Sequence, residues 1–271
     1  MDRPTWAPDT IDLERPSAAR IYDYLLGGSH NFAVDRALAG KMLEAFPEAM
    51  EDAQANRAFL RRAVKVCAEA GIRQFVDIGS GIPTAGNVHQ VAEQYAPDAR
   101  VVYVDLDPVA VAHSQAILAD DDRATAIQAD VRQPHSILDH PETRKLIDVD
   151  APVALLTVAV LHFVSDDQQP ARVVAEYADR LAPGSHLVLS HIASDINPEM
   201  ARRLTELSAR TTTPGTFRSH AEVSAMFNGW TLLEPGLVPV PLWRPDSPID
   251  AEDADSSRVY AGVGRKEAST L

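Results

Sequence analysis

Residues 74–83, Gln-Phe-Val-Asp-Ile-Gly-Ser-Gly-Ile-Pro, constrain the fold more than any other part of the chain. Phe75, Val76 and Ile78 form a short apolar run typical of a buried strand, and Gly79-Ser80-Gly81 ends it. A helical pattern follows near residues 84–95. A strand, a glycine turn and a helix in this order predict a backbone-lined pocket at the carboxyl end of a strand, where open α/β sheets bind nucleotide-like ligands. An ordinary strand-to-helix turn has the same pattern, so residues elsewhere in the chain are needed to distinguish a ligand-binding turn from an ordinary one.

The residues around the glycines distinguish between nucleotide ligands. The dinucleotide fingerprint G-x-G-x-x-G has a third glycine, and Thr84 stands at that position here. Asp77 lies just before the turn, where a carboxylate repels a pyrophosphate and suits a cation. S-adenosylmethionine carries an ammonium and a sulfonium and has no phosphate. The pattern therefore favours S-adenosylmethionine over NAD.

Two further predicted strands are also followed by aspartate. The run 101–105 ends in Asp105, at about the 20-residue spacing from the glycines at which an acidic residue accepts the ribose hydroxyls. Asp107 precedes Pro108, which predicts a helix N-cap. The run 125–131 contains Asp130, which is placed to accept from an adenine amino group. Three aspartates at the ends of three strands indicate one nucleoside site along one edge of a sheet.

Strand and helix patterns alternate from residue 73 onward. Strands are expected near 74–78, 100–105, 125–128, 152–158, 186–192, 230–233 and 258–263. Helices are expected near 84–95, 108–118, 134–146, 168–181, 198–210 and 219–227. This alternation predicts an α/β fold with a doubly wound, mostly parallel, seven-stranded Rossmann-like sheet and right-handed crossovers.

The chain before residue 72 is helical in pattern. Residues 1–16 are rich in proline and charge and are expected to be flexible. A short helix from 17 stops at Gly27-Gly28, and two more follow near 38–46 and 50–70. We expect residues 17–71 to form a helical lid over a ligand-binding domain of residues 72–271. Cys67 lies on the apolar stripe of the third helix and is expected to pack in the core.

Composition excludes several classes of protein. The net charge of −14 argues against a nucleic-acid partner, and the basic group Arg57, Arg61, Arg62 and Lys65 is expected to be a solvated helix face. The single cysteine fits a reducing compartment, and no segment has the pattern of a signal peptide or a membrane span. We therefore expect a cytoplasmic protein with no membrane partner. No motif with the spacing of a metal site is present.

These motifs resemble those of class I S-adenosylmethionine-dependent methyltransferases. The matching pieces are Val76-Asp-Ile-Gly-Ser-Gly81, Val104-Asp-Leu-Asp-Pro108, Ala129-Asp-Val131 and Leu181-Ala-Pro-Gly184. Segments 19–28, 31–32, 56–61 and 74–84 are similar, more closely, to the bacterial S-adenosyl methyltransferase family, long catalogued as a domain of unknown function. The resemblance covers most of residues 16–265. One departure is Pro83, which replaces the last glycine of the G-x-G-x-G loop.

The resemblance implies a cofactor role for each matching residue. It implies S-adenosylmethionine as the cofactor, with Asp77 facing its ammonium and Gly79, Ser80 and Gly81 passing its methionyl part. Asp105, followed by Leu106, would hold the ribose hydroxyls. Asp130 and the Val131 amide would read the adenine.

The residues that could act on a methyl acceptor are less strongly indicated. His162 and Phe163 follow the fourth strand, a position that faces the methyl group in this class. His162 could act as a general base, or it could be a structural imidazole. His191 and Asp195 are weaker candidates of the same kind. Tyr22, Asn31 and Phe32 are expected to face the pocket from the lid, although Tyr22 could equally be a core aromatic. Arg218 could meet an anionic acceptor, although a surface salt bridge is the stronger alternative.

The absence of two motifs narrows the chemical class of the methyl acceptor. No Asn/Asp-Pro-Pro-aromatic run follows the fourth strand, and no cysteine lies near the predicted site, which disfavour nucleobase methylation. A small molecule with an oxygen or nitrogen acceptor atom is the favoured partner. Two alternatives stay open: a non-catalytic protein that senses S-adenosylmethionine or S-adenosylhomocysteine, and an NAD-dependent oxidoreductase.

Overall fold

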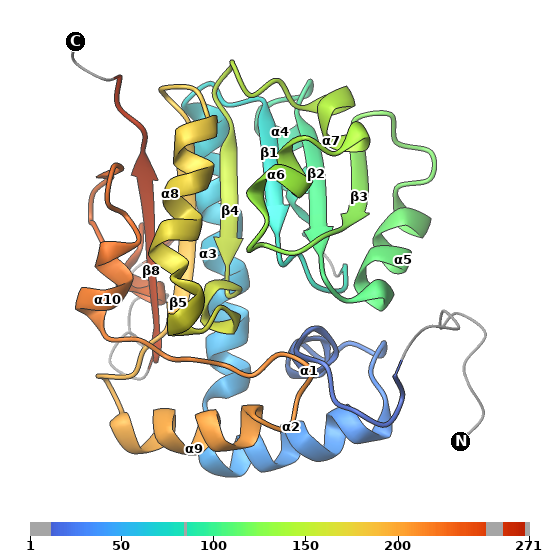
Figure 1. Cartoon of the computed structure of the whole chain (residues 1–271), viewed down its shortest axis with the longest axis vertical. Helices are drawn as coiled ribbons and strands as arrows, with labels where there is room; N and C mark the ends of the chain where they lie inside the picture. Colours follow the sequence, from blue (N-terminus) through green and yellow to red (C-terminus); the bar gives the residue numbers. More distant parts are fainter. Residues whose placement is uncertain (1–11, 84–85, 248–256, 269–271) are drawn as a thin grey trace.

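A mostly parallel sheet of eight strands forms the centre of the molecule (Figure 1). The structure, a computed structural model, describes residues 12–83, 86–247 and 257–268. The strands are β1 (Gln74–Ile78), β2 (Arg100–Asp105), β3 (Ala124–Gln128), β4 (Ala154–Val158), β5 (His186–Ile192), β6 (Thr231–Leu232), β7 (Val238–Pro239) and β8 (Val259–Arg265). Their order is β3-β2-β1-β4-β5-β8-β6, with β7 also paired to β8. Strands β1 to β5 are parallel, and β8 is antiparallel to its neighbours.

The predicted α/β class and doubly wound sheet are confirmed. The sheet has eight strands rather than seven because it includes β7, a two-residue strand that pairs with β8. β7 lies in a proline-rich stretch whose sequence has no strand pattern. Part of that stretch, residues 248–256, lies outside the described residues. The same holds for residues 1–11 of the expected flexible terminus and for Thr84.

Helices and helical turns connect the strands. The helices are α1 (Ala18–Leu25), α2 (Ala33–Ala45), α3 (Ala49–Glu69), α4 (Val88–Tyr95), α5 (Pro108–Ile117), α6 (Pro134–Leu138), α7 (Pro141–Leu146), α8 (Pro170–Arg180), α9 (Pro198–Ser208) and α10 (His220–Ala225). Short 3-10 turns are η1 (Leu161–Phe163), η2 (Asp166–Gln168) and η3 (Val240–Leu242). The single helix expected over 134–146 is wrong. Pro141 disfavours helical geometry at His140, whose side chain caps the new helix by accepting from Glu142 N at 3.2 Å.

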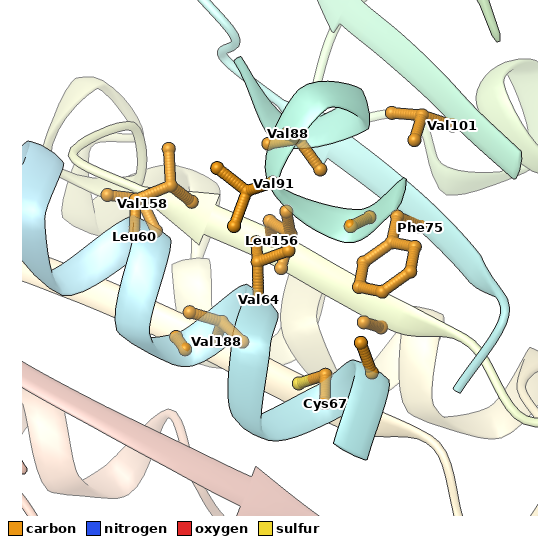
Figure 2. Close-up of a cluster of buried hydrophobic side chains, with 14 of the residues drawn as sticks. Leu60, Val64, Cys67, Phe75, Val88, Val91, Val101, Leu156, Val158 and Val188 are labelled. Atoms are coloured by element: carbon orange, nitrogen blue, oxygen red, sulfur yellow. The ribbon is translucent and has the colours of Figure 1, made fainter. Parts of the chain in front are cut away.

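Alternating side chains of the strands feed two separate cores. On one face Phe75, Val101, Leu156 and Val188 pack against α3 and α4 (Figure 2). Cys67 lies fully buried in this cluster, as predicted, and burial raises the pKa of its thiol to about 12. On the other face the intervening residues pack against α6, α7, α8 and α10. Because both faces are covered, the central strands are buried and mostly apolar.

A layer of helices lies beyond the carboxyl ends of the parallel strands. Helices α1, α2 and α9 cross this end of the sheet, and α3 runs from the layer back along the sheet (Figure 1). Ile21, Leu38, Phe46 and Leu204 share a third apolar core within the layer. Helix α9, which follows β5, therefore completes a layer otherwise built from the N-terminal helices. No helix of the described part of the chain is long and apolar enough to cross a membrane.

Candidate active site

The parallel strands end at one cavity of about 710 Å³. Asp77, Asp105 and Asp130, which end or follow β1, β2 and β3, all line it. Parallel neighbouring strands bring their carboxyl ends to the same edge of the sheet, which is why aspartates far apart in sequence meet here. Residues of α1, α2, α3 and α9 close the opposite side. The volume lies in the range of about 300–1,000 Å³ that small-molecule sites occupy.

The glycine turn after β1 needs glycine for two different reasons. Gly79 and Gly81 have φ values of 71° and 66°, in the left-handed region that favours glycine. A Cβ on Gly79 would lie 2.5 Å from Cγ2 of Val160, which is too close. A Cβ on Gly81 would have no atom within 4 Å among the residues that the structure describes. The amides of Gly79 and Ser80 donate to the Val104 carbonyl at 2.8 and 3.2 Å. The turn is thus attached to β2 and keeps its backbone on the cavity wall.

Asp105 is buried and already holds the turn in place. Its Oδ2 accepts from Gly81 N at 2.7 Å, and its Oδ1 accepts from Asp107 N at 2.8 Å. Burial raises its pKa to about 6, against the effect of these donors. The Leu106 amide also acts on this carboxylate, whose two oxygens have about four lone-pair sites in all, so it retains capacity to accept from a ribose hydroxyl. Leu106, which follows it, lines the cavity with an exposed side chain.

Asp77 is a buried carboxyl that lacks a hydrogen-bond donor. It is 5% exposed, and no described residue donates a hydrogen bond to its side chain. Burial raises its pKa to about 7, the charge of Arg57 opposes this rise, and Asp105 adds to it. A buried carboxylate is stabilised by a cation that hydrogen-bonds to it. This part of the cavity therefore favours a ligand with a positive charge.

Two members of the basic group on α3 are not part of a solvated face. Arg57 is half-buried and lines the cavity. Arg62 is buried, and its guanidinium donates to the carbonyls of Trp243 and Val240 at 2.9 and 3.0 Å. The expectation failed because helical spacing does not reveal that α3 lies between the sheet and the C-terminal segment.

Asp130 lines the cavity but has a partner of its own. The guanidinium of Arg132 binds both carboxylate oxygens, with Nε at 2.8 and 2.9 Å. The Val131 carbonyl accepts from the Tyr177 hydroxyl at 2.9 Å, which fixes the backbone that follows β3. An adenine amino group would share Asp130 with Arg132, and adenine recognition by Asp130 and Val131 stays a prediction.

Of the three expected lid residues, Tyr22 lines the cavity and the other two do not. Asn31 is buried, and its amide donates to Asp23 Oδ2 at 2.8 Å and to the Gly28 carbonyl at 3.0 Å. Phe32 packs with Ile82 and the start of α5. The loop after Gly28 turns back on α1, where Asn31 fixes the end of that helix. Phe32 packs the helical layer against Ile82 and the start of α5.

A buried ion pair joins α1 to α2 and to the loop after β2. Arg20 Nε lies 2.8 Å from Asp35 Oδ2, and both side chains are almost fully buried. Asp35 also accepts from the amides of Ser17 and Phe32 at 3.0 and 2.8 Å. Asp107 caps α5 as predicted, and its other oxygen accepts from the Ser17 hydroxyl. The helical layer is therefore attached to the loop after β2 at Asp107, two residues beyond Asp105.

A second connection joins α1 to the turn after β4. Asn56 donates to the Tyr22 hydroxyl at 3.0 Å, and the Tyr22 hydroxyl donates to the Ala53 carbonyl at 3.2 Å. The Ser190 hydroxyl donates to Asn56 Oδ1 at 2.6 Å and accepts from Ala159 N at 3.0 Å. Burial raises the pKa of Tyr22, so its side chain is a neutral phenol. These bonds fix one wall of the cavity from the lid to the end of β4.

His162 and Phe163 both line the cavity from η1. His162 is 4% exposed, and its Nδ1 is buried without a hydrogen-bond partner. Burial holds its pKa well below the usual range, and the neighbouring His191 and Arg218 add to this effect. The imidazole is therefore neutral at physiological pH.

Arg218 does not line the cavity, and its expected surface location is wrong. It is 3% exposed, and its guanidinium donates to the carbonyls of Leu161 and Val164 at 3.2 and 2.7 Å. It also donates to Asp166 Oδ1 at 2.7 Å and lies 3.1 Å from His191 Nε2. Arg218 thus fixes the loop that carries His162, an arrangement that depends on contacts far apart in sequence.

The two weaker candidates, His191 within β5 and Asp195 after it, also lie outside the described lining of the cavity. His191 Nδ1 lies 2.8 Å from the Ile192 carbonyl, and burial lowers its pKa to about 4. Asp195 accepts from the Tyr260 hydroxyl at 3.0 Å. Both groups have structural partners.

Sequence reasoning missed a set of polar residues from the helical layer. Asp52, Asn56 and Arg57 lie on one face of α3 and line the cavity together with Arg20. The spacing of Asp52 and Asn56 by four residues could have indicated a shared face. It could not indicate that this face turns toward the sheet edge.

Comparison with known proteins agrees with this geometry. A sequence model of the S-adenosyl methyltransferase family matches residues 4–267. The crystal structure of a proposed methyltransferase from Thermobifida fusca YX has 42% sequence identity and a TM-score of 0.92, covering 98% of this chain and 100% of that one. A DUF574 family protein from Streptomyces avermitilis has 39% identity and a TM-score of 0.90, covering 94% and 99%.

More distant proteins share only the fold. An O-methyltransferase family protein from Burkholderia thailandensis has 15% identity and a TM-score of 0.51, covering 82% of this chain and 61% of that one. No curated protein is significantly similar to this chain. The family match spans nearly the whole chain, and the site lies where its motifs meet. The chain therefore belongs to the S-adenosyl methyltransferase family and is an S-adenosylmethionine-dependent methyltransferase of the class I fold.

Proposed function

We propose that this enzyme transfers a methyl group from S-adenosylmethionine to an oxygen or nitrogen atom of a small molecule inside this cavity. One observation carries the proposal: a single cavity has the strand-end aspartates on one side and the helical layer on the other. We call these the cofactor end, at Asp77, Asp105 and Asp130, and the acceptor end. The acceptor end is lined by α1, α2, the first turns of α3, α9 and residues 212–217.

The residues of the cofactor end fit S-adenosylmethionine. Asp77 accepts no hydrogen bond from any residue that the structure describes, and its carboxylate would accept from the ammonium. Arg57, whose charge acts on Asp77, would meet the carboxylate beside that ammonium. Asp105 would accept from the ribose hydroxyls with the acceptor capacity that its backbone donors leave unused. Asp77 disfavours NAD, because a buried carboxylate beside the glycine turn would repel a pyrophosphate.

The protein supplies alignment of the reacting groups. When bound, S-adenosylmethionine supplies a methyl group on a positively charged sulfur. The helical layer covers one side of the cavity. A chain of hydrogen bonds that links Tyr22, Asn56, Ser190 and the Ala159 amide fixes the wall beside the end of β4. Orientation of this kind lowers the barrier of a transfer reaction by removing the need to bring its parts together. His162, being neutral, could take a proton from an acceptor on Nε2, since Nδ1 is buried.

Calorimetric titration tests the cofactor assignment. Wild-type protein should bind S-adenosylmethionine and S-adenosylhomocysteine and should not bind NAD. Asp105→Asn should weaken both affinities by about tenfold or more, since hydrogen bonds to charged groups contribute about 1.5–3 kcal/mol each. Asp122→Asn, at an exposed acid after α5, is the matched control and should leave both affinities unchanged. Failure of the wild type to bind S-adenosylhomocysteine would reject the assignment.

A product assay tests the transfer. Incubation with small-molecule phenols, alcohols and amines should yield S-adenosylhomocysteine and a methylated product with at least one of them. His162→Gln should lower kcat by about 10²-fold or more if His162 is a general base, with little change in cofactor affinity. An unchanged kcat would limit His162 to lining the site. Methylation of RNA, DNA or protein alone would contradict the small-molecule assignment.

A further inference from the structure

Asp52 is the feature of the acceptor end that the proposed chemistry leaves unexplained. It lies in the first turn of α3, is 6% exposed and lines the cavity. Its Oδ2 accepts from Arg258 N at 3.0 Å, and Ser257 donates to its carboxylate. An asparagine could accept these bonds equally well. A carboxylate is therefore not needed to hold the start of β8.

The side chains around Asp52 are mainly apolar. At this end the cavity is lined by Leu25, Met42, Phe46, Ala49, Ala53, Leu204, Phe217 and Val259. Burial in these surroundings raises the pKa of Asp52 to about 6, although the Arg258 amide and Ser257 oppose the rise. A charged group in an apolar wall is costly unless a partner of opposite charge binds it. The wall at this end therefore suits an apolar molecule, and Asp52 adds one carboxylate to it.

The cations of the described lining at this end act on groups other than Asp52, and Arg20 on α1 pairs with Asp35 at 2.8 Å. Tyr22 is a neutral phenol, and His162 is a neutral imidazole. Arg57 is the cation on the next turn of α3, and its charge acts on Tyr22 and on Asp77 at the cofactor end. Outside the lining, Arg258 attracts Asp52 and Glu48 repels it. A ligand at this end therefore meets a negative wall.

We propose that the methyl acceptor is an apolar molecule with a cationic amino group, and that Asp52 binds this ammonium. The inference rests on the proposed function, because it assigns the acceptor of that same cavity. The ammonium donates charge-assisted hydrogen bonds to the oxygen of Asp52 that does not hold Arg258 N. The apolar body lies against Leu25, Phe46 and Leu204. Anionic acceptors such as carboxylates and phosphate esters are excluded by repulsion.

Three probes of matched shape test this recognition without relying on turnover. 2-Phenylethylamine, 2-phenylethanol and phenylacetate are titrated by ligand-observed NMR into protein saturated with S-adenosylhomocysteine. The wild type should bind the amine at least about tenfold more tightly than the alcohol, and the carboxylate most weakly. Asp52→Asn should reduce the preference for the amine to about threefold or less, while the alcohol affinity stays within about twofold. Glu51→Gln, at the exposed neighbouring acid, should keep the preference.

The outcomes separate this proposal from the proposed function. Equal affinity of the wild type for amine and alcohol, including no binding of either at about 10 mM, would overturn it. Persistence of the amine preference in Asp52→Asn would overturn it too. Asp52→Asn should leave the affinity for S-adenosylhomocysteine unchanged, and thermal unfolding verifies that the variant is folded. Failure of the wild type to bind S-adenosylhomocysteine would instead reject the cofactor assignment and leave the proposal about Asp52 without its basis.

Discussion

The two ends of the cavity are built by different means. The cofactor end consists of strand ends and one glycine turn, and backbone hydrogen bonds within the sheet edge fix the turn and Asp105. The acceptor end is assembled from helices before the sheet and from α9 and residues 212–217 after β5. Its cohesion depends on a small apolar core and on buried polar contacts such as Arg20 with Asp35. The cofactor end is therefore local in origin, and the acceptor end is a product of long-range packing.

This difference predicts how each end responds to mutation. A change at the cofactor end should alter ligand affinity and leave the helical layer intact. A change in the polar contacts of the layer should loosen the layer first, because its apolar core is small. It should affect the cofactor end only indirectly, through Asp107 and through the turn after β4.

The largest effect is expected for Asp35→Ala. The substitution leaves the Arg20 guanidinium buried without its partner and removes acceptors from two amides, which should lower the free energy of unfolding by about 3–5 kcal/mol. Urea unfolding measures this loss, and hydrogen exchange should show faster exchange in α1 and α2 than in β1 to β5. Glu199→Ala breaks an exposed ion pair on α9 and serves as the control. Equal stability of the two variants would remove the proposed dependence of the layer on this pair.

Gly79→Ala should give the next largest effect, at the other end. Its Cβ would overlap Val160, and its φ is positive, so we expect about 2–3 kcal/mol of destabilisation together with weaker S-adenosylhomocysteine binding. Gly81→Ala is a matched control that carries the backbone strain without the overlap. Val160→Ala should restore part of the stability in the double variant. Equal effects of the two glycine variants, with no rescue, would show that the close approach is unimportant.

The pH dependence of the ligand-free protein should distinguish the ends further. Burial raises the pKa of Asp77 to about 7 from its ordinary 3.8, so folding favours its protonated form. This contribution to stability is complete below about pH 4 and is lost as the pH rises through 7. Asp77→Asn should therefore stabilise the ligand-free protein at pH 8 by about 1–3 kcal/mol and flatten its dependence on pH.

The same variant should weaken S-adenosylmethionine binding, because the uncharged amide no longer attracts the ammonium. Denaturant unfolding between pH 5 and 8 measures the stability, and calorimetry measures the affinity. Asp105, whose pKa is also raised by burial, to about 6, leaves a smaller residual slope in the variant. A variant as pH-dependent as the wild type would contradict the assignment to Asp77.

The smallest effect is expected for Tyr22→Phe. The phenol makes two hydrogen bonds, to Asn56 and to the Ala53 carbonyl, and their loss should cost about 1 kcal/mol of stability. Cofactor affinity should stay unchanged, since Tyr22 belongs to the acceptor end. An effect on S-adenosylhomocysteine binding equal to that of Asp105→Asn would show that the two ends are not separate.

The sequence could predict the cofactor end because its signals are local. The spacing of apolar runs located β1, β2 and β5 at the bounds that the structure has. The carboxyl ends of neighbouring parallel strands lie at the same edge of a sheet. Asp77, Asp105 and Asp130 could therefore be placed at this edge from the sequence alone. The Asp107 cap also followed from neighbouring residues alone.

The acceptor end could not be predicted in this way. Helical periodicity showed that α3 has an apolar face, but it could not show that Asp52, Asn56 and Arg57 face a cavity or that Arg62 is buried. The roles of Asn31 and Arg218 were missed for the same reason. Each side chain binds groups that only the folded chain brings near.

The fold class, the cofactor family and the glycine turn could be predicted from the amino-acid sequence, because they follow from backbone rules that act over a few residues. Which buried polar groups find partners depends on tertiary packing. Asp77 and Asp52 are both buried acids, yet no described residue donates a hydrogen bond to the Asp77 carboxyl, whereas Asp52 accepts from the Arg258 amide. Burial and hydrogen bonding depend on every element that surrounds a side chain, and those contacts come from segments as distant as α3 and β8.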